Sequence, residues 1–385
     1  MTVFWVSTFL NTAAAGLVLL RPRRAASGRR SRPPVDARRL GCAAVVTLIA
    51  LGLELPLLRH TGMNKFGAMN LAFLSLFVML PVLGLSTLIA AVACRRPNPG
   101  PYVSKTVCAL AVVAVGLAPI GAYASLIEPY SLRLETAGLG VPPGRAGREP
   151  LRIGVLTDIQ TDHITDYEES AVAKLMSQQP DVILLPGDFY QGPAARFAAA
   201  LPAYRNLLAG LHAPGGVFAV LGNIDGRDTL ECLVQGTSVR LLLDESVRIP
   251  VRDRIVTLCG VSSYSCSTPA SMKALRECES LPGEDDIRIL LCHSPDGALA
   301  LSPSSRIDLV VSGHTHGGQI VFPLIGPLVT FSHVPRNVGA GGLHTLNGHP
   351  VYVSRGVGRE SSQAPCVRFL CPPDVSVVNL GERAR

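Results

Sequence analysis

The chain has 385 residues, of which 48% are hydrophobic and 5% aromatic, and its formal net charge is +7. This length allows two or more domains. A dense arginine cluster in residues 21–39 lies directly beside apolar segments. Such a cluster is typical of a cytoplasmic loop in a membrane protein, and the low aromatic content offers no platform for stacking bases, so no nucleic-acid partner is expected.

Four apolar segments precede residue 130, near residues 3–20, 40–58, 68–93 and 106–127. Each is close to the length of about 20 residues that spans a bilayer. The first segment lacks a basic start and is followed by basic residues, which favours a membrane anchor over a cleaved signal peptide. We therefore predict a transmembrane region of about four helices over residues 1–130. With the arginine cluster in the cytoplasm, this multi-pass arrangement in the cell membrane places the rest of the chain on the extracytoplasmic side.

Residues 131–150 are rich in Gly and Pro and are predicted to be a linker. Beyond them, strand patterns alternate with helical patterns, which is typical of an α/β domain over residues 151–385. Helices are expected over residues 168–178, 194–208 and 270–278. Denser strand patterns over residues 239–243, 247–250 and 255–261 indicate a second sheet.

Five apolar, β-rich runs in this domain end on polar side chains that can bind a metal ion. The side chains are Asp158, Asp188, Asn223, His293 and the pair His314 and His316. The histidine pair lies in the run SGHTHGGQ, whose glycines allow close approach of the backbone. Ligand sites of open α/β folds lie past the ends of strands, and carboxylate, amide and imidazole groups together suit a pair of divalent ions.

The order D…GD…GN…H…GHxH, spread over most of residues 151–380, resembles the pattern of the calcineurin-like metallophosphoesterase superfamily. The strings SGHTHGGQI and YVSRGVG…PCVRFLCPPDVSVVNL are similar to its membrane-associated bacterial branch. The resemblance implies a four-layer α-β-β-α sandwich of two mixed sheets. It also implies two divalent ions as cofactors, with Mn²⁺, Zn²⁺, Fe²⁺ and Mg²⁺ as the candidates.

The resemblance further implies a role for each ligand position. Asp188 would bridge the two ions. Asp158 and His316 would hold the first ion. The second ion would be held by Asn223, His293 and His314.

One departure from the superfamily pattern concerns the first ion. The usual DxH motif here reads Asp158-Ile159-Gln160, so Gln160 is expected to be the remaining ligand of the first ion. An amide oxygen binds a hard ion, but it binds softer ions less tightly than imidazole does. The nearby Asp162 and His163 are alternative ligands.

A second departure concerns the chemistry. The usual GNH motif followed by an acid here reads Gly222-Asn223-Ile224-Asp225. The histidine of that motif usually donates a proton or contacts the phosphate, and Ile224 does neither. Asp188, Asn223 and Asp225 are therefore the expected catalytic side chains. Arg355, Arg359 and Arg368, near a glycine turn close to the C-terminus, are candidates for binding a substrate phosphate.

These features predict a membrane-anchored, binuclear, metal-dependent phosphoric ester hydrolase. Two divalent ions would activate water and hold the phosphoryl oxygens for in-line attack. The expected partners are the lipid bilayer and a phosphate ester or pyrophosphate, and a lipid is one such substrate because a short linker holds the site near the headgroups. The alternative, motivated by Gln160 and Ile224, is a catalytically weak or inactive protein that keeps the fold as a binding or regulatory module.

Overall fold

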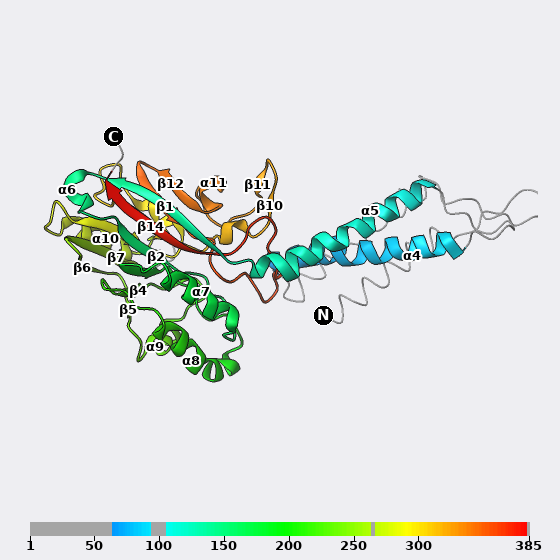
Figure 1. Cartoon of the computed structure of the whole chain (residues 1–385), viewed down its shortest axis with the longest axis horizontal. Helices are drawn as coiled ribbons and strands as arrows, with labels where there is room; N and C mark the ends of the chain where they lie inside the picture. The colour runs from blue at the N-terminus through cyan, green and yellow to red at the C-terminus, as the bar shows by residue number, and fades with distance from the viewer. Residues whose placement is uncertain (1–63, 94–104, 263–265, 383–385) are drawn as a thin grey trace, which may run out of the picture. The chain divides into compact units, whose positions relative to one another are not determined.

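The structure, a computed structural model, describes residues 64–93, 105–262 and 266–382. It divides into two compact units (Figure 1). One comprises the chain up to Tyr123 together with Gln363–Pro365, and the other comprises Ala124–Ser362 and Cys366–Arg385. The apolar segments near residues 3–20 and 40–58 and the arginine cluster of residues 21–39 lie outside the described residues.

The described part of the first unit is helical. It contains α3 (Lys65–Leu74), a π-helical segment (Ser75–Met79), α4 (Leu80–Ala93) and α5 (Lys105–Ala122), and α4 packs against α5. Two continuous helical spans, Lys65–Ile89 and Lys105–Tyr130, are long and apolar enough to cross a membrane by length and composition. The helices expected near residues 68–93 and 106–127 are thus present, and they suggest association with a membrane.

The second unit is built on two six-stranded mixed sheets. The first sheet has the order β1 (Arg133–Val141), β14 (Asp374–Glu382), β2 (Leu151–Val155), β3 (Val182–Leu185), β4 (Val217–Ala219), β5 (Val239–Leu241). The second has the order β12 (Gly342–Leu346), β13 (His349–Val353), β9 (Leu309–Ser312), β8 (Ile287–Leu291), β7 (Arg254–Gly260), β6 (Glu245–Val251). Strands β2 to β5 are mutually parallel, as are β7, β8, β9 and β13.

Helices cover the outer face of each sheet. The first sheet carries α7 (Asp166–Met176), α8 (Ala194–Ala209) and α9 (Arg227–Val234). The second carries α10 (Pro269–Ser280), a 3₁₀ helix (Pro295–Ala300) and α11 (Arg336–Gly339). A short α6 (Pro143–Ala146) follows β1. Helix α7 begins at a capping box, in which Thr165 and Glu168 each bond the other's backbone N–H.

Three buried apolar clusters correspond to the three interfaces of a four-layer sandwich. Strand β3 shows the reason, because Leu184 packs between the two sheets while Ile183 and Leu185 pack under the helices. Side chains alternate across a strand, so a strand covered on both faces is apolar throughout. The expected α-β-β-α sandwich is confirmed.

The structure corrects two expectations about the elements and adds one helix. Residues 131–150 are not only a linker, because β1 pairs in parallel with β14 along its whole length, from Arg133 with Asp374 to Val141 with Glu382. The Gly- and Pro-rich composition concealed an edge strand whose partner lies at the far end of the chain. Strand β5 belongs to the first sheet and not to the second. Helix α9 was not expected.

Candidate metal centre

Loops after five strands of the two sheets bring the candidate ligands together. Because β2, β3 and β4 run parallel, as do β8 and β9, their carboxyl ends meet at one edge of the sandwich. Several of these residues have a left-handed backbone, which is uncommon for side chains other than glycine. They are Asp158 (φ 52°), Gln160 (φ 41°), Asp188 (φ 59°), His314 (φ 69°) and His316 (φ 48°). Such concentrated backbone strain is typical of functional sites.

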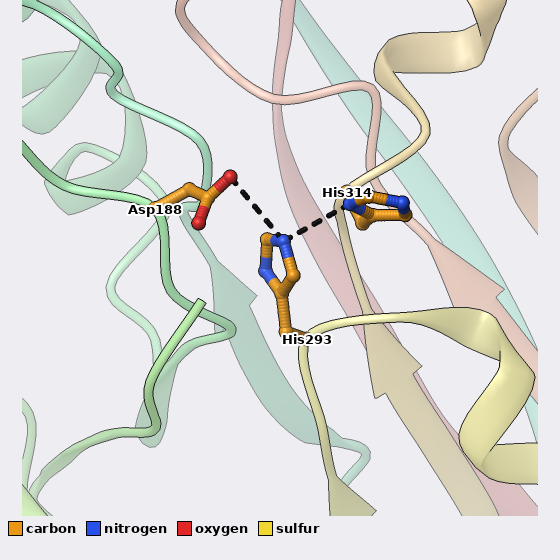
Figure 2. A group of neighbouring side chains, drawn as sticks. All are labelled: Asp188, His293 and His314. Carbon is orange, nitrogen blue, oxygen red and sulfur yellow. Dashed lines mark hydrogen bonds and ion pairs between the residues drawn. The ribbon is translucent and has the colours of Figure 1, made fainter. Parts of the chain in front are cut away.

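Asp188, His293 and His314 form the tightest cluster, with one ligand atom of each lying within 4.8 Å of the others (Figure 2). The Nε2 atom of His293 lies 3.3 Å from Oδ2 of Asp188 and 3.2 Å from Nδ1 of His314. It also lies 2.9 Å from Oδ1 of Asn223. The structure thus brings together the four side chains expected around the second ion.

The second nitrogen of each histidine defines its tautomer. Nδ1 of His293 lies 3.0 Å from the carbonyl oxygen of Pro186, and Nε2 of His314 lies 3.2 Å from that of Phe331. A carbonyl only accepts, so both of these nitrogens donate, and in a neutral imidazole the facing nitrogen is the one that can bind a metal ion. The two facing nitrogens lie 3.2 Å apart, and a proton on one of them lets it donate to the other. Imidazole held in this way by a carbonyl is the usual arrangement of a metal ligand.

The charges in this cluster agree with a cation site. Burial lowers the pKa of His293, but the Asp188 carboxylate outweighs burial and holds that pKa at about 9. Burial and the neighbouring His293 lower the pKa of His314 to about 4. Burial raises the pKa of Asp188, yet His293 outweighs it and keeps the pKa well below its usual range. In the metal-free chain a proton on His293 therefore balances Asp188, and a bound ion would replace that proton.

A second cluster contains Asp158, Gln160 and His316, all of which are buried. Oδ1 of Asp158 lies 3.7 Å from Nε2 of His316, and Nε2 of Gln160 donates to Oδ2 of Asp188 at 2.8 Å. Nε2 of His316 and Oε1 of Gln160 are buried without a hydrogen-bond partner among the described residues. Buried polar atoms without partners are costly, and an ion beside Asp158 would satisfy both of them. Burial raises the pKa of Asp158 to about 7, which a nearby cation would reverse.

The alternative ligands for the first ion lie outside this cluster. Asp162 bonds His163 at 2.6 Å and Arg196 at 2.8 Å, and the His163 side chain is 72% exposed. Both alternatives thus belong to a surface ion pair, whereas Gln160 lies within the cluster.

Asp225 is a positioning residue. Its carboxylate accepts hydrogen bonds from the backbone N–H groups of Asp188 (2.7 Å), Phe189 (3.0 Å) and Gly222 (2.9 Å). Burial and then the adjacent Asp188 raise its pKa to about 6. The carboxylate thus ties the loop after β3 to the loop after β4, and the catalytic role expected from the sequence stays a prediction.

Position 224 contributes to the centre through its backbone. The N–H of Ile224 donates to Oδ1 of Asp188 at 3.0 Å. Glycine is required nearby, since a Cβ on Gly222 would lie 1.9 Å from the same oxygen. The loop after β4 therefore holds Oδ1 of Asp188. Gln160, in the loop after β2, bonds Oδ2 of the same carboxylate.

The segment before β14 packs against the metal centre through Arg368. Arg368 is fully buried and donates to the carbonyl oxygens of Arg355 (2.7 Å) and Cys371 (3.2 Å). Its guanidinium lies 3.5 Å from Nδ1 of His316. Arg355 bonds Asp374 at 2.9 Å. These two arginines are occupied within the fold, which leaves Arg359 as the available candidate of the three for binding a phosphate.

A pocket of about 790 Å³ opens beside the centre, and Gln160 forms part of its wall. Arg359 and Tyr130 lie in the same wall, with the guanidinium 5.1 Å from the centre of the aromatic ring. Nε of Arg359 is buried and has no hydrogen-bond partner among the described residues. Nη2 of Arg359 donates to the hydroxyl of Tyr130 at 3.1 Å. Arg359 thus brings a cationic group to the wall of the pocket.

Glu360 is a site residue that the sequence did not indicate. Burial and then the Asp188 carboxylate raise its pKa, and its side chain bonds those of Gln191 and Gln160. Its backbone N–H donates to Oε1 of Gln319 at 2.7 Å. No motif marks Glu360, because it reaches the centre from a loop that only the folded C-terminal segment brings there.

The sandwich and its cluster of carboxylate, amide and imidazole groups define a metallohydrolase-like domain. Comparison with known proteins assigns it further: residues 151–318 match the family model described as calcineurin-like phosphoesterase. These residues are therefore a domain of that family, which confirms the resemblance. Proteins of this family bind divalent metals, usually two.

Two curated relatives illustrate the similarity. The chain is 27% identical over 234 residues to the uncharacterized metallophosphoesterase YkoQ of Bacillus subtilis, covering 59% of this chain and 84% of YkoQ. It is 26% identical over 242 residues to the phosphodiesterase YaeI of Escherichia coli, covering 60% of this chain and 82% of YaeI. Among solved structures, the calcineurin-like phosphoesterase YfkN from Bacillus subtilis matches with a TM-score of 0.36 and 13% identity, covering 60% of this chain and 90% of that chain.

Proposed function

We propose that the protein is a membrane-anchored phosphoesterase that uses two divalent ions to hydrolyse a phosphate ester. The main support for the proposal is the buried cluster of Asp188, His293 and His314, whose ligand atoms lie within 4.8 Å of one another. Divalent ions, when bound, would polarise the phosphoryl oxygens and lower the pKa of water. Asp158, Gln160, Asp188 and His316 would hold the first ion. Asp188, Asn223, His293 and His314 would hold the second.

Other residues would position the metal ligands and bind the substrate. Asp225 and the N–H of Ile224 hold Asp188 in place. Arg359, whose Nε is free to donate, would bind an anionic oxygen of the substrate in the pocket. The similarity to YaeI, a phosphodiesterase, favours a diester as the first substrate class to test.

A lipid substrate is the finer part of this proposal. Two helices suited to crossing a membrane lie in the same chain as the pocket, and we propose that they anchor the centre near lipid headgroups. The volume of about 790 Å³ lies within the range of roughly 300–1,000 Å³ that small-molecule sites occupy. Tyr130 both ends the second helical span and lines the pocket, so the pocket adjoins the end of that helix.

The direct test uses the purified full-length chain. It would be loaded with Mn²⁺ or Zn²⁺ and assayed with bis(p-nitrophenyl) phosphate, p-nitrophenyl phosphate and phospholipids in detergent micelles. We expect turnover of at least one ester, and its loss in the Asp188→Asn variant. An Arg359→Gln variant should raise KM more than it lowers kcat, because Arg359 is assigned to binding.

The second candidate is a metal-binding module without turnover, favoured by the apolar side chain at Ile224. Two bound ions with no hydrolysis of any ester in the panel would support it over the enzyme.

The proposed orientation has its own test. We propose that the phosphoesterase unit lies outside the cytoplasm, on the basis of the arginine cluster in residues 21–39. A reporter that is active only outside the cytoplasm should work when fused after Arg385. Activity of a cytoplasm-only reporter at the same position would contradict this orientation.

A further inference from the structure

Exposed apolar side chains of the phosphoesterase unit gather around one hairpin. Strands β10 (Val321–Phe322) and β11 (Gly326–Pro327) form this hairpin, which projects from the body of the unit (Figure 1). The large apolar side chains exposed in the hairpin and just after it are Phe322, Leu324, Ile325, Leu328 and Val329. Among the described residues from Ala124 onward, the other large exposed apolar side chains are Leu126, Ile127, Tyr130, Leu370 and Leu299.

The tip of the hairpin holds a leucine in an unfavourable conformation. The N–H of Ile325 donates to the carbonyl of Phe322 at 3.2 Å, which places Pro323 and Leu324 at the centre of a tight turn. Leu324 has a φ of 68°, in the region where glycine or asparagine is preferred. Its side chain is nevertheless fully exposed. In water an exposed leucine gains nothing that offsets this strain, so the tip is suited to an apolar environment.

The hairpin is tied to the end of an apolar helix. The carboxylate of Glu128 accepts hydrogen bonds from the backbone N–H groups of Leu370 (2.8 Å) and Cys371 (2.6 Å). The carbonyl of Phe369 accepts a hydrogen bond from the N–H of Val321, where β10 begins, at 2.9 Å. Three consecutive residues thus connect the helix end to the root of the hairpin.

That helix identifies the apolar environment. The span Lys105–Tyr130 is suited to crossing a membrane and ends in an exposed tyrosine, a residue enriched where helices leave the bilayer. Leu126, Ile127 and Leu370 are exposed beside the residues that connect the helix end to the hairpin. A lipid bilayer is the partner that fits these apolar side chains, because they are connected to the end of a helix suited to crossing a membrane.

The hairpin is also joined to the metal centre at both ends. It follows directly after His316 and the glycine turn, and a Cβ on Gly318 would lie 2.5 Å from Pro327. Just after it, the carbonyl of Phe331 accepts the hydrogen bond from Nε2 of His314. A surface that binds the hairpin would therefore also fix the position of the metal centre relative to that surface.

We propose that the hairpin of residues 321–329 inserts into the surface of the lipid bilayer and thereby presents the metal centre to lipid phosphates. The insertion is inferred from the exposed apolar side chains and from the apolar helix connected to the hairpin. The consequence for lipid phosphates rests on the proposed function.

The insertion is tested by tryptophan fluorescence in the full-length chain. Trp5 is the only tryptophan in the sequence, so Trp5→Phe gives a parent chain without tryptophan fluorescence. Leu324→Trp would report on the tip, and Leu299→Trp, at the exposed leucine of the 3₁₀ helix Pro295–Ala300, is the matched control. Both variants would be placed in phosphatidylcholine vesicles whose acyl chains carry bromine, a quencher confined to the bilayer.

We expect strong quenching of Leu324→Trp and little quenching of Leu299→Trp. Equal quenching at both positions, or none at the tip, would overturn the proposal. A tip tryptophan that is shielded from acrylamide in water but is not quenched by bromine would mean that a protein surface or a second copy covers the hairpin.

The consequence for activity has a separate readout. The Leu324→Ser/Ile325→Ser variant should hydrolyse phosphatidic acid in phosphatidylcholine vesicles several-fold more slowly than the parent chain. Its hydrolysis of bis(p-nitrophenyl) phosphate should be unchanged. An equal loss on both substrates, or no loss on either, would contradict the presentation of the centre to lipids. If the parent chain hydrolyses neither, the proposed function fails while the quenching result still decides insertion.

Discussion

The two halves of the metal centre differ in how completely the chain supplies their ligands. Around the second ion, His293 and His314 each have one nitrogen committed to a carbonyl and one directed into the cluster. In the proposed first site, Gln160 offers an amide in place of an imidazole, and its Oε1 lacks a partner among the described residues. Preorganised imidazole binds borderline ions more tightly than an amide oxygen does. The second site should therefore fill first, and the first site should exchange its ion more readily.

The largest effect is expected at the residue that both halves share. Asp188→Asn removes the charge that faces both clusters, so we expect loss of about two ions and a fall in turnover on the order of a thousandfold. Metal content and ester hydrolysis measure the two losses. Asp162→Asn, outside both clusters, is the control and should retain both properties. Near-normal metal content in Asp188→Asn would show that the halves do not share this ligand.

The pH dependence should separate the two halves. An ion at the second site displaces a proton from His293, whose pKa is about 9, so affinity there should rise about tenfold per pH unit up to that pH. At the first site the relevant proton is on Asp158, whose pKa is about 7, so affinity there should level off above that pH. Metal titrations at several pH values above 7 would resolve one rising and one flat affinity. Two parallel curves would contradict the assignment.

A smaller effect is expected from the residue that connects the loops. Asp225→Asn replaces an acceptor of three backbone N–H groups by an amide that accepts through one oxygen, at a cost of about 1–3 kcal/mol in unfolding free energy. Thermal unfolding of the metal-free and metal-loaded chain measures it. Because Asp225 positions Asp188, metal affinity should fall while the pH dependence of turnover keeps its shape. A changed pH profile would instead indicate a direct catalytic role.

The smallest effect is expected at the first metal site, where Gln160 is the proposed ligand. Gln160→His should raise affinity for Zn²⁺ at the first site by roughly tenfold, since imidazole donates more strongly than an amide. Turnover at limiting metal should rise or hold. Gln191→His, in the same pocket wall, is the control for adding a histidine without placing it in the cluster. Unchanged Zn²⁺ affinity in Gln160→His would remove Gln160 from the ligand set.

Much of the fold was predictable because its pattern is local. The runs around β3 and β9 are apolar on both faces, those around β2 and β8 are apolar on the face between the sheets, and each is followed by a polar ligand within a few residues. Strand β1 was not predictable, since its exposed, glycine-containing sequence becomes a strand only through pairing with β14. Local pattern therefore identifies central strands better than edge strands.

The site shows the same division. Asp158, Asp188, His293 and His314 follow strands directly, so their positions could be expected from the sequence. Glu360 could not be expected, because it reaches Gln160 from the C-terminal segment without a motif. The positioning role of Asp225 required knowing which N–H groups face it. Contacts between loops that are distant in sequence are what the structure adds.

The central claim is that one chain binds two ions of unequal affinity, with Asp188 between them. The most direct measurement is the metal content of the purified full-length chain titrated with Zn²⁺, compared with its His293→Ala and His316→Ala variants. We predict two ions in the parent chain, loss of the tighter one in His293→Ala and loss of the weaker one in His316→Ala. A parent chain that binds a single ion, unchanged in His316→Ala, would contradict the account.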